Sequence, residues 1–187
     1  MNEQSASTHT VNDFFYDALY VCGIGGGVIA LFFCAYDSIV HGDPLFTPGL
    51  LGSALFDRAN PATIRAVGMG AITKYTAFHM LAFSVLGLGI SFLAQAAKIY
   101  RRPWVVLGLV FAILEVGFWL ATQIAVPGVI QRIGIVPVTI ANLLAATGIA
   151  MFLSSAHRPG LVHRMRRALH LGRDEAAESP SPASERR

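Results

Sequence analysis

The chain has 187 residues, of which 54% are hydrophobic and only 13% are charged. Soluble domains carry about 25% charged residues, so this composition excludes an ordinary soluble domain and indicates an integral membrane protein. The formal net charge is +3, but half of the Lys and Arg residues follow residue 157. This uneven distribution gives no reason to expect nucleic-acid binding.

The first transmembrane helix is predicted at residues 14–40, with Asp37 near its end. The preceding residues 1–12 are polar and lack apolar periodicity, so we expect them to be disordered. The glycine-rich stretch inside the span lacks the preceding strand and the third glycine of a dinucleotide-binding loop. We therefore interpret Gly23 and Gly27 as a helix-packing pair, because small residues four positions apart let two helices approach closely.

The next apolar segment, residues 41–56, cannot be a simple transmembrane helix. Pro44 and Pro48 interrupt it, and the remainder from Gly49 to Phe56 is too short to cross a bilayer. We expect it to lie on one membrane face or to dip into it. The Asn-Pro-Ala tripeptide that follows at residues 60–62 also occurs in water channels, but it appears once and without a repeat, so we interpret it as a turn.

Three further apolar stretches complete the predicted bundle, at residues 71–97, 104–126 and 137–154. Pro103 suits the first turn of the third span, because proline needs no backbone donor there. The predicted fold class is therefore all-α, with residues 13–155 forming a four-helix transmembrane domain.

The C-terminal part is predicted to contain an amphipathic helix at residues 156–173, followed by a disordered tail at residues 174–187. Arg164, Arg166 and Arg167 lie on its polar side, where they would contact anionic lipid headgroups. Basic residues near span ends favour the cytoplasm, so this segment and the basic link after the second span predict that both termini are cytoplasmic.

Glu115 is the most informative polar residue, because it lies at the centre of the third predicted span. Insertion scales give a cost of about 2.5–3.5 kcal/mol for an acidic residue there, so Glu115 must be protonated, paired or solvated. Four other polar residues in the spans could join it in an intramembrane cluster, namely Asp37, Tyr75, His79 and Asn142.

Three roles for this cluster remain open. It could supply interhelical hydrogen bonds that fix the packing, form a proton or ion pathway through Glu115 and His79, or bind a ligand within the membrane. The chain has no HExxH motif, no pair of histidines suited to haem ligation within the spans, and no Cys-x-x-Cys motif. We therefore predict no catalytic residue, no metal site and no cofactor.

The run from Asp37 to Gly52, followed by Tyr75-x-x-x-His79, resembles a group of small, uncharacterised bacterial four-helix membrane proteins. The loop residues that carry the resemblance are Gly42, Pro44, Thr47, Pro48 and Gly52. The resemblance implies the helix count and a proline-rich external loop, and it is consistent with the bacterial inner membrane, but it implies no activity. The leading interpretation is a non-enzymatic structural or accessory membrane component that associates with itself or with a membrane complex.

Overall fold

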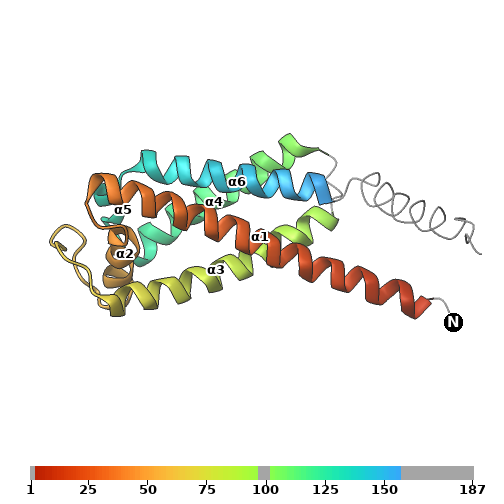
Figure 1. The fold of residues 1–187 in the computed structure, drawn as a ribbon, viewed down its shortest axis with the longest axis horizontal. Coiled ribbons are helices and arrows are strands. Elements are labelled where there is room, and N and C mark those ends of the chain that lie inside the picture. Colours follow the sequence, from red (N-terminus) through yellow and green to blue (C-terminus); the bar gives the residue numbers. More distant parts are fainter. Residues whose placement is uncertain (1–2, 97–101, 157–187) are drawn as a thin grey trace, which may run out of the picture. The chain divides into compact units, whose positions relative to one another are not determined.

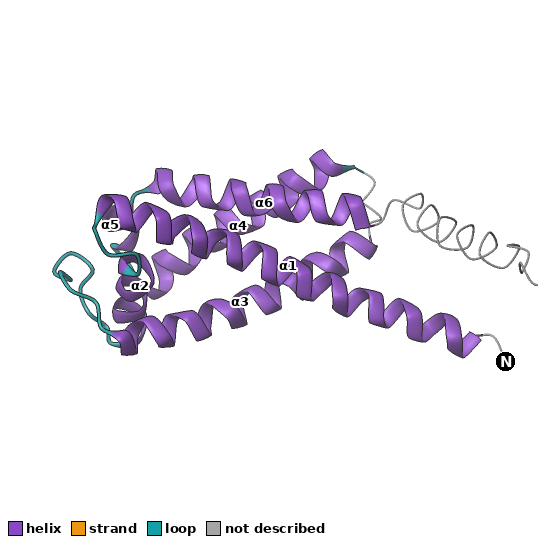
Figure 2. Cartoon of the chain, in the orientation of Figure 1, coloured by secondary structure: helices purple, strands orange, loops and turns teal. Residues whose placement is uncertain are grey.

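The structure is a computed structural model that describes residues 3–96 and 102–156 (Figure 1). Four long helices and two short ones make up this part of the chain, and Figure 2 shows helices joined by loops, without a strand among the described residues. Their bounds are α1 Glu3–Val40, α2 Phe46–Phe56, α3 Met69–Ala96, α4 Pro103–Ala125, α5 Val129–Ile133 and α6 Ile135–Ala156. The all-α prediction is confirmed.

Four of these helices are long and apolar enough to cross a membrane, and they cover Phe15–Val40, Met69–Ala94, Pro103–Ala125 and Ile135–Ser155. Each agrees with a predicted span to within a few residues. A stretch of about 20 apolar residues matches the bilayer thickness, so hydropathy alone locates such helices well. The chain is therefore described below as a multi-pass membrane protein.

The N-terminal end of α1 differs from the prediction. We expected disorder over residues 1–12, but α1 already begins at Glu3. Extending an existing helix costs far less than nucleating one, so the apolar part of α1 can carry the polar residues before it. The predicted basic helix with Arg164, Arg166 and Arg167 and the predicted tail at residues 174–187 lie outside the described residues.

The first core joins all four long helices, with buried members such as Val21, Phe83, Val110 and Ile149. Helix α1 approaches this core through Gly25, where a Cβ would lie only 2.9 Å from the Phe83 ring and 3.0 Å from Ile149. A larger residue at this position would have to displace both neighbours. The close approach of α1 to α3 and α6 therefore depends on glycine at this position.

Gly23 and Gly27 face open space within this chain, so their predicted packing role stays a prediction. A Cβ at either position would meet no described atom within 4 Å, whereas Gly25 and Gly26 are buried against α3. Successive helical residues are about 100° apart, so Gly23 and Gly27 share one side of α1, whereas Gly25 and Gly26 lie on other sides. Their spacing identifies a small-residue surface but does not show which side the neighbouring helix covers.

The short helix α2 packs against the beginning of α3. A Cβ at Gly52 would overlap the backbone carbonyl of Ala71, and a Cβ at Gly49 would overlap the Val67 side chain. The backbones therefore touch where a side chain would separate them. Leu50 of α2 is fully buried in a second core, which also includes Val129 of α5.

Candidate functional site

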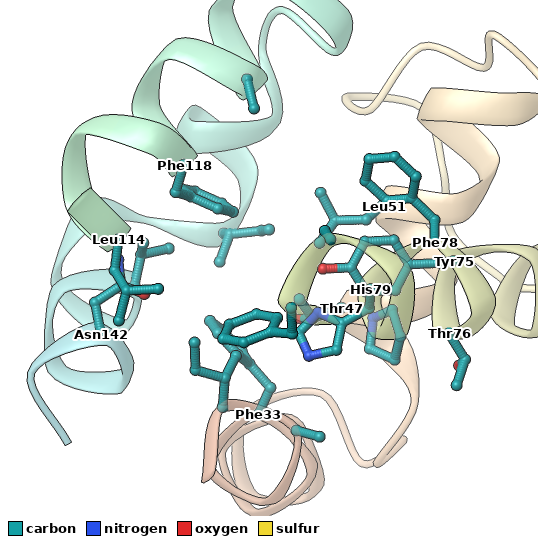
Figure 3. Close-up of a pocket in the computed structure, with 18 of the residues that line it drawn as sticks. Phe33, Thr47, Leu51, Tyr75, Thr76, Phe78, His79, Leu114, Phe118 and Asn142 are labelled. Atoms are coloured by element: carbon teal, nitrogen blue, oxygen red, sulfur yellow. The ribbon is translucent and has the colours of Figure 1, made fainter. Parts of the chain in front are cut away.

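A cavity of about 380 Å³ lies between the helices, next to α2 (Figure 3). Its size falls within the range of small-molecule sites, which are mostly apolar clefts of roughly 300–1,000 Å³. All six helices contribute to its walls, and apolar side chains predominate. The four phenylalanines among them are Phe33, Phe78, Phe83 and Phe118.

A few polar side chains interrupt this apolar lining. Tyr75 and His79 extend from α3 toward the middle of the cavity, and Asn142 lies on the opposite side (Figure 3). Thr47 of α2 also lines the cavity. None of the described lining residues is Asp, Glu, Lys or Arg. The site can therefore form hydrogen bonds but offers no permanently charged partner.

Tyr75, His79 and Phe83 form one row along α3, because they are four residues apart. Their neighbouring ring centroids lie 5.7 Å and 4.7 Å apart. The Nε2 atom of His79 lies 3.3 Å from the carbonyl oxygen of Gly26 on α1. A carbonyl only accepts hydrogen bonds, so Nε2 is the donor in this contact.

Exposed residues of α1, α3 and α4 line the cavity, so it reaches the protein surface along these helices. Phe78 and Ala82 form a ridge on α3, and Gly117 and Ala121 form a ridge on α4; all four residues line the cavity and are exposed. A Cβ at Gly117 would meet no described atom within 4 Å, so there is free space beside α4. In a bilayer, these exposed lining residues of the membrane-spanning helices face the lipid.

Asp37 lies behind one wall of the cavity and is completely buried. The backbone N–H of Thr47 donates to its Oδ2 at 2.6 Å, and the Thr47 hydroxyl donates to its Oδ1 at 2.8 Å. The carboxylate therefore holds the first turn of α2, where a negative charge also interacts favourably with the helix dipole.

Glu115 links α4 to α6 and does not line the cavity. Its Oε1 accepts a 2.7 Å hydrogen bond from the Thr139 hydroxyl, and its Oε2 accepts a 2.8 Å hydrogen bond from Asn142 Nδ2. Asn142 is only 4% exposed. Both carboxyl oxygens are therefore engaged by polar groups of the neighbouring helix.

Three of the five residues of the predicted polar cluster line the cavity, and the other two contact its lining residues. Tyr75, His79 and Asn142 line the cavity, whereas Asp37 and Glu115 lie outside its lining and bind the lining residues Thr47 and Asn142. Sequence reasoning did not identify Thr139 as a partner of Glu115. Its position three residues before Asn142, on the same side of α6, was the available signal.

No group of three His, Cys, Asp or Glu side chains that could hold a metal ion occurs within the described residues. No protein-family model, curated protein or solved structure matches this chain. The cavity is therefore the feature of the molecule from which a function can be inferred.

Proposed function

We propose that this protein binds a lipophilic small molecule within the membrane. The observation that carries the proposal is the cavity of about 380 Å³, which has a mostly apolar lining and exposed lining residues on α1, α3 and α4. Unfilled space of this kind deprives the surrounding side chains of dispersion contacts and lowers stability. A molecule that partitions into the bilayer can reach this space and restore those contacts.

The proton or ion pathway has less support. Such a path requires Glu115 and His79 to share a wet cavity, but only His79 lines this one, and the oxygens of Glu115 are bonded to Thr139 and Asn142. A structural or accessory role in a membrane complex, the leading interpretation of the sequence, is compatible with ligand binding. A purely structural role does not account for the cavity.

Filling the cavity provides the direct test. Gly117→Leu would place a side chain into the free space beside α4, and Gly108→Leu is the matched control, because it also lies in α4 with open space at its Cβ but does not line the cavity. We expect lipid-extract mass spectrometry to find a lipophilic molecule retained by wild type and Gly108→Leu in bilayer nanodiscs, and depleted in Gly117→Leu. Equal amounts of every extracted molecule in all three proteins would contradict the proposal.

We also propose that the protein resides in a bacterial inner membrane with both termini in the cytoplasm. The basic residues beside the spans and the resemblance of the proline-rich loop support this placement. A reporter inserted at Ala59 should be external, and one fused after Arg173 should be cytoplasmic. If both reporters mark the same side, the proposed topology is wrong.

A further inference from the structure

We infer that the bound molecule belongs to the quinone class, with a neutral carbonyl-bearing ring and an apolar tail. This inference rests on the proposed function and names the ligand of the same cavity. Four features of the site bear on it: its charge, its hydrogen-bonding groups, its aromatic walls and its opening.

The charge of the lining selects a neutral ligand. None of the described lining residues is Asp, Glu, Lys or Arg, and the imidazole of His79 is already bonded to the Gly26 carbonyl. The nearby carboxyl groups of Asp37 and Glu115 are bonded to protein donors. A phosphate or carboxylate headgroup would lose its hydration without gaining a cationic partner, which is costly in an apolar site. Phospholipid and fatty-acid headgroups therefore do not fit, whereas a carbonyl needs only a hydrogen-bond donor.

Hydrogen-bonding groups lie on opposite sides of the cavity. Tyr75 projects from α3, and Asn142 lies on the opposite side (Figure 3). The Tyr75 hydroxyl can donate to one carbonyl oxygen, and the Asn142 amide has a second N–H beyond the one bonded to Glu115. A quinone carries two carbonyl acceptors at opposite edges of one ring, so it complements donors placed on two walls.

Aromatic side chains surround the same space. Phe33, Phe83 and Phe118 belong to three different helices and all line the cavity, as does the His79 ring. Aromatic rings pack favourably in stacked or edge-to-face arrangements, at about 0.5–1.5 kcal/mol per pair beyond the burial of area. A conjugated planar headgroup gains such contacts, and its apolar tail can leave past exposed lining residues such as Ala82 and Gly117.

The experiment compares how tightly two probes with the same tail bind to the protein in nanodiscs. Decylubiquinone has the carbonyl-bearing ring, and decylbenzene lacks the carbonyls. Bound probe is counted by native mass spectrometry over a titration. We expect wild type to bind decylubiquinone roughly tenfold more tightly, and Tyr75→Phe to reduce this preference about fivefold, the effect of one hydrogen bond. Tyr20→Phe is the control, because Tyr20 packs on Phe152 and does not line the cavity.

The cavity-filling variant Gly117→Leu distinguishes a failure of the quinone inference from a failure of the lipophile-binding proposal. If both probes bind equally well and Gly117→Leu weakens both, the quinone inference is overturned and the lipophile-binding proposal stands. A preference for decylubiquinone that Tyr75→Phe leaves unchanged also overturns the inference, because the Tyr75 hydroxyl would not contact the ligand. If neither probe binds, or if Gly117→Leu binds both as wild type does, both proposals are wrong.

Discussion

Glu115 provides the sharpest test of how the bundle is held together. Glu115→Leu removes both acceptors of the α4–α6 contact and leaves the Asn142 amide, which is only 4% exposed, without its partner. Glu115→Gln is the conservative variant. Its amide oxygen can accept from Asn142, and its amide N–H can donate to the Thr139 hydroxyl, which turns to accept.

The magnitude follows from the two hydrogen bonds. Interhelical hydrogen bonds in membrane proteins average about 0.6 kcal/mol and reach about 1.7 kcal/mol, so two of them contribute roughly 1–3 kcal/mol. We therefore expect Glu115→Leu to lower the free energy of unfolding by about 1–3 kcal/mol. Glu115→Gln should cost less than about 1 kcal/mol, since both contacts can be re-formed.

The assay is equilibrium unfolding in bicelles, with Val116→Leu as the control because Val116 is 55% exposed on the same helix. A double-mutant cycle with Asn142→Leu isolates the coupling between positions 115 and 142. The reasoning fails if Glu115→Leu unfolds like wild type, or if the coupling energy is zero, because either result would mean that the 2.8 Å contact contributes nothing.

Two further predictions concern the attachment of α2. Asp37→Leu should lower the free energy of unfolding by about 2–4 kcal/mol, because it leaves the buried N–H and hydroxyl of Thr47 without an acceptor, whereas Asp37→Asn should cost less; thermal unfolding that ranks the two variants equally would contradict this. Gly52→Ala should lower the melting temperature, because the new Cβ would overlap the Ala71 carbonyl, whereas Gly23→Ala, with open space at its Cβ, should not.

Much of the fold follows from hydropathy, but the details of the site do not. The four spans could be predicted because their length and apolar character are set by the bilayer. The sides that the helices bury depend on their neighbours, which is why Gly25 and Gly26, and not Gly23 and Gly27, pack against α3. The cavity could not be predicted, because it exists only once all the helices are in place.

The structure also gives a physical reason for the proline-rich sequence at the start of α2. A short helix that is buried against a bundle must satisfy the backbone N–H groups of its first turn within the protein. In α2, Phe46 N–H donates to the Asp43 carbonyl at 3.1 Å, Thr47 N–H to Asp37 Oδ2 at 2.6 Å, and Gly49 N–H to the Leu45 carbonyl at 3.0 Å. The intervening residue is Pro48, which has no N–H.

The residues that carry the sequence resemblance therefore build one wall of the cavity. Asp37 accepts a hydrogen bond from the Thr47 N–H in the first turn of α2, and Pro48 in the same turn has no N–H. Gly52 lets α2 approach α3, the helix that carries Tyr75 and His79. A first turn whose backbone donors are all engaged does not compete for a ligand oxygen. Recognition is then left to the side chains that project from α3 and α6. Of these, Tyr75 is outside both the α4–α6 contact and the Asp37–Thr47 contact, so Tyr75→Phe should change ligand preference without unfolding the bundle.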